Sequence, residues 1–126
     1  MFAYILIGTN DRERAKAFYD GLMPELGMER FMDFGHISFY GKSLTEPFLG
    51  VCTPIDRNDA TLGNGSMVAL AAESIDAVDR IYKKALELGA SCEGEPGVRA
   101  AGFYCAYFRD PDGNKFNACF PAEVKG

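Results

Sequence analysis

The stretch from Tyr104 to Phe120 reads YCAYFRDPDGNKFNACF. Two apolar runs rich in β-forming residues flank the segment Asp-Pro-Asp-Gly-Asn at 110–114. Pro111 fixes its own φ at about −65° and has no N–H to donate to a strand ladder, whereas Gly113 or Asn114 tolerates a positive φ. The stretch therefore predicts two strands joined by a hairpin loop of a few residues.

Length, charge and the first residues limit what this hairpin belongs to. At 126 residues the chain has the size of one domain and can remove about two-thirds of its unfolded surface from water. It carries 18 acidic and 13 basic residues, and its longest basic run is Lys83-Lys84, so nucleic acid and anionic membranes are poor partners. The apolar run from Met1 to Ile7 has no basic leader and is too short for a signal peptide or a membrane span. We expect a cytoplasmic protein.

The four cysteines, at positions 52, 92, 105 and 119, have no CxxC spacing. Three of them lie inside apolar, strand-like runs, where a free cysteine behaves as a small buried apolar residue. We therefore expect reduced thiols and no zinc knuckle.

The chain outside the hairpin divides into two similar halves. In the first half, Phe2 to Gly8 predicts a strand, and Asn10 or Asp11 caps an amphipathic helix that runs through Leu26 and stops at Gly27. Strand-like runs follow at Phe34 to Tyr40 and Phe48 to Thr53.

The second half repeats this order. Met67 to Ala72 predicts a strand, and Ser74 or Asp76 caps a helix that stops at Gly89. Strand-like runs follow at Ser91 to Glu93, Phe103 to Arg109 and Lys115 to Phe120.

A repeated pair of residues relates the two halves. Leu26-Gly27 recurs as Leu88-Gly89, 62 residues further along, and two copies at this interval indicate a duplicated half-domain rather than a solenoid. The segment 57–65, rich in Asn, Asp and Gly, joins the copies. We predict one α+β domain of two βαβββ modules, at about 1–56 and 66–122.

Three segments carry a resemblance to a known family. They are GTNDRERAKAFY at 8–19, GNGSMVAL at 63–70 and FRDPDGNKFN at 108–117. Together with the paired modules they resemble the vicinal oxygen chelate superfamily, which contains glyoxalase I, the bleomycin and fosfomycin resistance proteins and the extradiol dioxygenases. The resemblance covers nearly the whole chain and implies cupped, antiparallel-rich mixed sheets that enclose a small-molecule cavity.

The same resemblance implies a metal site whose usual ligands this chain lacks. The ligand positions of metal-using members, normally His, Gln or Glu, correspond here to Tyr4, Met67 and Asn117. Glyoxalase-type members add a Glu in the last strand of the first half, but Phe48 to Thr53 has no carboxylate and Glu46 lies just outside it. Phenol, thioether and amide groups do not hold a hard cation tightly, so we expect no metal and no cofactor.

These three residues and Cys119 are nevertheless candidates for ligand contact. In a strand of period two, Asn117 and Cys119 face the same way, and the Asn117 amide offers two donors and an acceptor. Tyr4 can equally be a core aromatic, Met67 can be a gap-filling core residue, and Asn117 can be satisfied by neighbouring backbone.

Three further residues extend the predicted ligand site. His36 is the only histidine, which makes it the best acid/base candidate, although a lone histidine in a strand is more often structural. Arg99 and Tyr104 flank the small-residue loop 100–102 at the expected mouth of the cavity, and arginine recognises carboxylate or phosphate through paired donors. Arg99 can also be an ordinary solvated surface charge.

Three functions remain open at this stage. We favour a homodimer that holds a small, partly apolar molecule without a metal, as the resemblance to bleomycin resistance proteins implies, with Tyr4 facing Met67 and Asn117 of the partner subunit. The alternative is a lyase, isomerase or dioxygenase-type enzyme, which uses a displaced metal set such as His36 with Glu46 or works without metal on His36 or Tyr4. The third is a dimeric protein-interaction scaffold whose cavity has lost its role.

Overall fold

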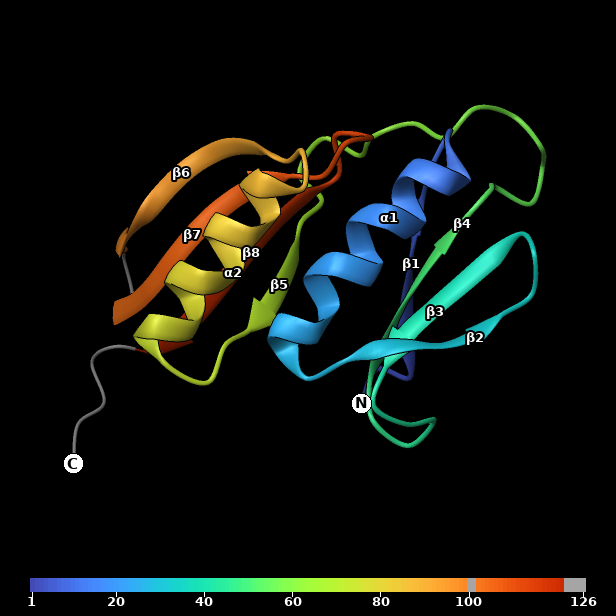
Figure 1. Ribbon diagram of the computed structural model, residues 1–126. Helices are drawn as coiled ribbons and strands as arrows, with labels where there is room; N and C mark the ends of the chain where they lie inside the picture. The colour runs from blue at the N-terminus through green and yellow to red at the C-terminus, as the bar shows by residue number, and fades with distance from the viewer. Residues whose placement is uncertain (100–101, 122–126) are drawn as a thin grey trace.

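The computed structural model describes residues 1–99 and 102–121 and contains two βαβββ modules (Figure 1). The first module consists of β1 (Tyr4–Gly8), α1 (Arg12–Leu22), the 3-10 helix η1 (Met23–Leu26), β2 (Glu29–Asp33), β3 (Ile37–Gly41) and β4 (Phe48–Cys52). The second consists of β5 (Val68–Ala71), α2 (Ile75–Glu87), β6 (Ser91–Val98), β7 (Phe103–Arg109) and β8 (Lys115–Pro121). Within the described residues, no helix combines the length and the apolar character needed to cross a membrane.

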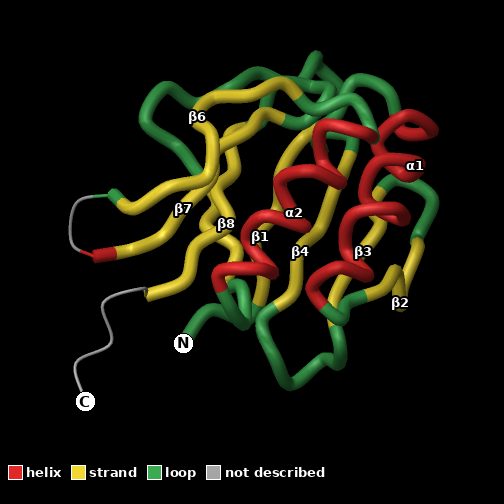
Figure 2. Tube along the Cα trace, turned by 60° about the vertical axis from the view of Figure 1, so that its left-hand side comes forward, coloured by secondary structure: helices red, strands yellow, loops and turns green. Residues whose placement is uncertain are grey.

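Each module forms its own four-stranded sheet. The strand orders are β1-β4-β3-β2 and β5-β8-β7-β6, with β1 parallel to β4, β5 parallel to β8 and the other pairs antiparallel. The helices α1 and α2 lie on the same side of the molecule, in front of the sheets in Figure 1, and Figure 2 shows them side by side. The predicted α+β fold with antiparallel-rich mixed sheets is therefore confirmed. We call the face of each sheet away from its helix the open face.

The helix starts follow the predicted caps. The Asp11 side chain accepts a hydrogen bond from the Arg14 N–H, and the Ser74 hydroxyl accepts one from the Ala77 N–H, which satisfies free donors at each first turn. The prediction that the first helix runs to Leu26 was wrong, because α1 ends at Leu22 and the chain tightens into η1. Pro24 lacks an N–H and its ring clashes with the carbonyl four residues earlier, so it ends the α-helical hydrogen bonding.

Two edge strands and one strand start were not predicted correctly. β2 begins and ends with charged residues, and β6 contains Gly94, Pro96 and Gly97, which sequence patterns treat as strand breakers. An edge strand pairs on one side only, so it tolerates charge and proline. The strand predicted from Phe34 begins at Ile37 instead, because Gly35 takes a positive φ of 84° in a turn.

The hydrophobic core crosses from one module to the other. The ring of Tyr19 on α1 lies 5.8 Å from the ring of Tyr40 and 6.0 Å from that of Phe116, in the second sheet. Burying such a side chain fully contributes about 1.5–3 kcal/mol. The fully buried large side chains of this core include Phe18, Tyr19, Leu22, Tyr40, Val51, Val78, Ile81, Phe108 and Phe116.

The turn at 110–114 connects the modules through Asp110, which is 4% exposed. Its carboxylate accepts hydrogen bonds from the Tyr19 hydroxyl of the first module, from the N–H of Asp112 and from the N–H and side-chain amide of Asn114. Burial and the neighbouring Asp110 charge raise the pKa of Tyr19 well above its ordinary value, so its hydroxyl stays protonated and donates.

Two further turn residues contact the start of the first module. The Asp112 carboxylate accepts hydrogen bonds from the Thr9 hydroxyl and the Asn10 N–H, and it pairs with Arg14 at 3.0 Å. The side-chain amide of Asn114 donates to the Gly8 carbonyl at 3.0 Å. We call residues 110–114 the inter-module turn, since their polar groups join elements about a hundred residues apart in sequence.

Candidate functional site

Aromatic side chains cover the open face of the first sheet. Tyr4 on β1 lies opposite Phe48 on β4, and their rings stack at 5.1 Å. The ring of Phe39 meets both edge-on, at 5.7 and 5.4 Å. A side chain at Gly50 would overlap with Phe39, so this glycine lets the ring lie over β4. We call Tyr4, Phe31, Phe34, Phe39 and Phe48 the aromatic cluster, whose remaining ring pairs are Phe31 with Phe48 and Phe34 with Phe39.

The open face of the second sheet carries Asn117 near its centre. Asn117 lies opposite Ala69 on β5 and Tyr107 on β7, and it is 5% exposed. Its side-chain oxygen Oδ1 is buried and has no hydrogen-bond partner. Buried polar atoms almost always have partners, and an unpaired one costs about 1–3 kcal/mol. The oxygen therefore keeps an unused acceptor, and a ligand donor would reach it only after the side chains around it move.

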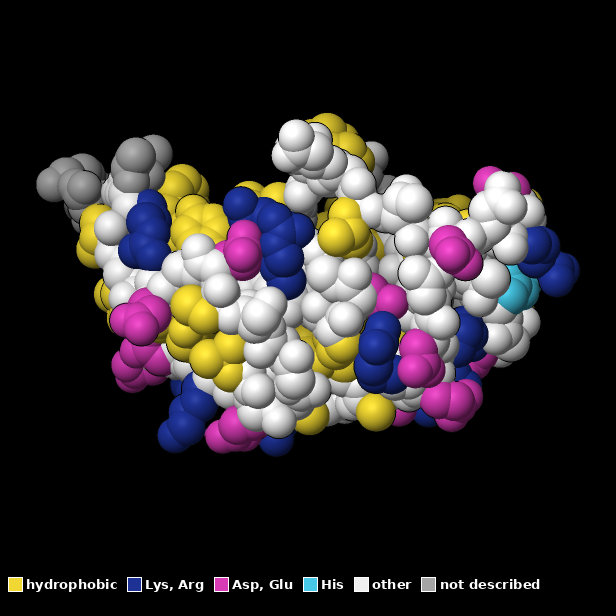
Figure 3. Space-filling view, turned by 90° about the horizontal axis from the view of Figure 1, so that it is seen from above, with side chains coloured by type: hydrophobic (Ala, Val, Ile, Leu, Met, Phe, Trp, Pro, Cys, Tyr) yellow, Lys and Arg dark blue, Asp and Glu magenta, His cyan; other side chains and the backbone are white. Residues whose placement is uncertain are grey.

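Basic groups surround Tyr107 on the same face. The Arg99 guanidinium carbon lies 5.5 Å from the Tyr107 ring centre and the Lys115 ammonium nitrogen lies 5.7 Å from it. Arg109, two residues along β7, instead pairs with Glu93 at 3.1 Å. Figure 3 shows basic side chains beside exposed apolar ones over the second module. This open face thus offers an amide, an aromatic ring and positive charge.

A cavity of about 510 Å³ lies between β1 and β5. Tyr4 and Met67 both line it, which brings together two of the predicted site residues. Asn117 does not line it, but its neighbour Ala69 does. Most of the lining is apolar, and its charged members are Lys42 and Glu46. The volume suits a small organic molecule.

The two residues predicted at the mouth of the cavity, Tyr104 and Arg99, lie on different faces of the sheet. Tyr104 was expected in the ligand site, but its hydroxyl donates to Asp79 of α2 at 2.8 Å, so Tyr104 faces the helix and not the open face. The reason is strand alternation, which turns Tyr104 away from Cys105 and Tyr107. Arg99 does reach the open face, whereas loop residues 100 and 101 lie outside the described residues.

Cys119 shares the open face with Asn117 and lies opposite Cys105 in the β7–β8 ladder. Burial, together with the neighbouring Cys105, raises the pKa of the Cys119 thiol. A protonated thiol is a poor nucleophile and metal ligand, so Cys119 is an apolar wall residue in this state.

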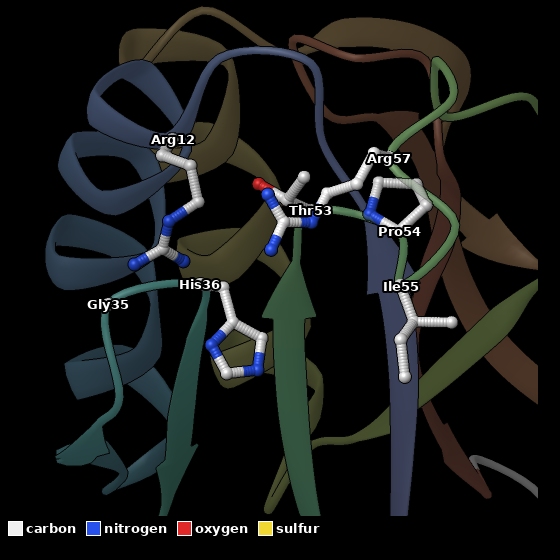
Figure 4. Close-up of a pocket in the computed structure, with 7 residues that line it drawn as sticks. All are labelled: Arg12, Gly35, His36, Thr53, Pro54, Ile55 and Arg57. Carbon is white, nitrogen blue, oxygen red and sulfur yellow. The ribbon is translucent and has the colours of Figure 1, made fainter.

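His36 lies apart from the other candidates. It precedes β3 in an exposed turn, where its Nδ1 lies 3.3 Å from the Phe34 carbonyl oxygen. It lines a different cavity, together with Arg12 and Arg57 (Figure 4). Glu46 lines the cavity between β1 and β5 instead, so His36 and Glu46 do not meet in one cavity as a displaced metal pair requires.

The residues at the implied metal positions do not fit a divalent ion. Tyr4, Met67 and Asn117 supply no imidazole and no carboxylate. Over residues 1–99 and 102–121, no three His, Cys, Asp or Glu side chains form a group that a metal ion could share. Hard cations require several oxygen ligands, and zinc requires nitrogen, sulfur or carboxylate ligands. We therefore derive no chemical step through a metal here.

Sequence reasoning missed Tyr107, Lys115 and the aromatic cluster as parts of these faces. Strand alternation alone could have placed both Tyr107 and Lys115 on the face of Asn117. A hairpin centred on 110–114 pairs Tyr107 with Asn117, and Lys115 lies two residues before Asn117 in the same strand. Phe39 and Phe48 meet Tyr4 only through the pairing of β1 with β4, which no local pattern predicts.

Comparisons with known proteins agree with this architecture. The model of the Glyoxalase/Bleomycin resistance protein/Dioxygenase superfamily matches residues 1–118, so the chain belongs to that superfamily. Among solved structures, a glyoxalase/bleomycin resistance protein from Albidiferax ferrireducens T118 is 38% identical, with a TM-score of 0.87 over 94% of this chain and 97% of that one. No curated protein matches significantly.

Two more distant structures share the fold alone. A glyoxalase-related enzyme from Fulvimarina pelagi is 20% identical, with a TM-score of 0.77 over 95% of this chain and 87% of that one. A lactoylglutathione lyase from Agrobacterium tumefaciens is 22% identical, with a TM-score of 0.67 over 94% and 92%.

Proposed function

We propose that this superfamily member is a binding protein that holds a small, partly apolar molecule without a metal. Two copies of the chain form the site, with the open face of the first sheet of one copy opposite the open face of the second sheet of the other. The observation that carries the proposal is the buried, unpaired Oδ1 of Asn117. A ligand that donates a hydrogen bond to it removes the cost of leaving it unpaired.

The aromatic cluster supplies the apolar wall. Tyr4 is 49% exposed and Phe34 is 61% exposed, although both pack against other rings. Exposed apolar surface of this kind marks an interaction site, because covering it contributes about 25 cal/mol per Å². An aromatic or aliphatic part of the ligand would lie against these rings.

The second sheet supplies the polar wall. The Asn117 amide provides directional hydrogen bonds, and Arg99 and Lys115 place positive charge beside Tyr107. This combination favours a ligand with a polar or anionic part as well as an apolar one.

A second copy fits because the two open faces complement each other. One face is mainly aromatic and the other is polar and basic. A twofold axis would pair the unlike faces twice in one closed dimer, as isologous assembly requires. The cavity between β1 and β5 would then open into the space between the chains.

Light scattering and dye binding test this function. We expect a dimer and saturable binding of 8-anilinonaphthalene-1-sulfonate, whose aromatic rings and amine suit the two walls. Asn117→Val should weaken this binding about tenfold, which corresponds to about 1.4 kcal/mol. The control Asn58→Val changes an exposed asparagine in the linker and should leave dye affinity unchanged.

Three outcomes would contradict the proposal. The first is a monomer without saturable dye binding, and the second is equal dye affinity in the Asn117→Val variant. The third is tight, stoichiometric uptake of nickel, zinc or iron by protein purified without chelator, which would favour a metal-dependent enzyme instead.

A further inference from the structure

We propose a second binding site, for a phosphate group, in the cavity at the end of the first sheet. This cavity has a volume of about 330 Å³ and shares no lining residue with the cavity between β1 and β5. Its lining residues are Arg12, Gly35, His36, Thr53, Pro54, Ile55 and Arg57 (Figure 4). The site is independent of the proposed function.

The charge of this lining is opposite to that of the whole protein. The chain has a net charge of −5, yet the lining contains two arginines and the only histidine and no carboxylate. Figure 4 shows Arg12, His36 and Arg57 entering the same hollow from three separate segments: the first turn of α1, the turn before β3 and the linker after β4. Two guanidinium groups in one cavity match the several oxygens of a phosphate.

Arg12 is held in place by the surrounding structure. Its side chain is 18% exposed, its Nη1 donates to the Val51 carbonyl at 3.3 Å, and its Nη2 lies 3.4 Å from the Asp33 carboxylate. Asp33 also pairs with Lys16 at 3.2 Å and with Arg30 at 3.1 Å. One carboxylate is thus shared by three cations, so it does not neutralise Arg12, and the guanidinium keeps donors for a bound anion.

The opposite wall is also ordered. The backbone carbonyl of His36 accepts a hydrogen bond from the Thr53 N–H at 3.0 Å, which joins the turn before β3 to the end of β4. His36, just before β3, and Thr53, just after β4, therefore border the cavity next to each other (Figure 4). The backbone of this wall therefore needs little ordering when an anion binds.

Arg57 has an unusual backbone conformation. Its φ is 67°, which makes it the only non-glycine among the described residues with a positive φ, and its N–H donates to the Pro54 carbonyl at 3.0 Å. Glycine or asparagine adopts this conformation at lower cost, and strained residues of this kind concentrate at functional sites. No carboxylate in the described part of the chain pairs with Arg57. The geometry thus places an uncompensated guanidinium at the cavity.

His36 provides a direct measurement, because the sole histidine gives one imidazole Cε1–H signal in a spectrum of tag-free protein. We would titrate the protein with sodium phosphate, and separately with glycerol 3-phosphate, at fixed pH and ionic strength. We expect a saturable shift of this signal below about 10 mM phosphate, a concentration that corresponds to weak binding. Tighter binding of the ester identifies an organic phosphate as the ligand, and equal binding identifies the free anion.

Arg57→Gly is the decisive variant, since glycine keeps the positive φ without strain and so preserves the fold. Phosphate affinity should fall at least about tenfold. The control Arg80→Gln removes the same charge from α2, where Arg80 pairs with Glu25, and should change affinity less than about twofold. Absence of a saturable shift, or equal losses in both variants, would overturn this site.

The two proposals can fail separately. Asn117→Val should leave phosphate binding intact, and Arg57→Gly should leave dye binding intact.

Discussion

Two buried polar side chains seven residues apart, Asp110 and Asn117, have opposite surroundings. Asp110 is 4% exposed and accepts four hydrogen bonds, whereas Asn117 is 5% exposed and its oxygen accepts none. Equal burial therefore does not mean an equal role. The saturated group stabilises the contact between modules, and the unsaturated one is the acceptor that we propose a ligand uses.

The largest effect is expected at Asp110. Asp110→Ala leaves the buried Tyr19 hydroxyl and the donors of the inter-module turn without an acceptor, which should lower the free energy of unfolding by about 3 kcal/mol. Urea denaturation measures this loss. The exposed control Asp59→Ala should change stability by less than about 0.5 kcal/mol. Equal effects in the two variants would contradict the role given to the inter-module turn.

Tyr19→Phe removes the other end of the same hydrogen bond. The ring stays in the core, so the expected loss is smaller, about 1–2 kcal/mol. In a double-mutant cycle with Asp110→Ala, the double variant should lose less stability than the sum of the two single losses, because each substitution removes the same shared contact. Strict additivity would show that the hydroxyl and the carboxylate act independently.

Asp33 is a carboxylate at the surface, in contrast to the buried Asp110. The Gly35 N–H, followed by Lys16 and Arg12, lowers the pKa of Asp33 to about 2. A lowered pKa contributes stability that is complete above the ordinary value of about 4 and is lost as pH falls from there to about 2. Asp33→Asn should cost about 1 kcal/mol or less at pH 7, and its stability should fall less steeply than that of the wild type between pH 4 and 2. Denaturation across this pH range, with Asp59→Asn as control, measures both effects.

Asn117→Val should produce almost no change in stability. The substitution removes an unpaired polar oxygen and places a β-branched residue in a strand, so the free energy of unfolding should rise by at most about 1 kcal/mol. Thermal and urea unfolding measure it beside Asp110→Ala. A loss above about 1 kcal/mol would mean that the Asn117 amide has a structural partner in the folded protein.

The smallest effect concerns thiol reactivity on the same open face. The raised pKa of Cys119 should make it react slowly with a disulfide reagent at pH 8, while the exposed Cys92 reacts first. Cys92→Ser should remove the fast phase and leave the slow one. Denatured protein, in which all four thiols react alike, is the reference.

The sequence predicted most elements because their signals are local. Asp11 and Ser74 satisfy free N–H groups at the helix starts, Gly27 and Gly89 adopt positive φ after the helices, and Gly113 does so in the hairpin turn. The edge strand β2 was missed because its charged residues have low β-propensity, and it forms only through pairing with β3. The position of Tyr104 was wrong because its loop suggested a cavity mouth, whereas its register in β7 turns it toward Asp79.

By itself, the sequence determined the two-module order, because periodicity and caps are properties of the chain, and its resemblance to the superfamily placed Tyr4, Met67 and Asn117 at the usual metal-ligand positions. Only the tertiary structure showed that the inter-module turn joins the two halves and that Asn117 is buried without a partner. It alone brought Arg12, His36 and Arg57 to one cavity. Hydrogen-bond saturation and charge clustering depend on contacts between distant segments, and these exist only after the modules have packed together.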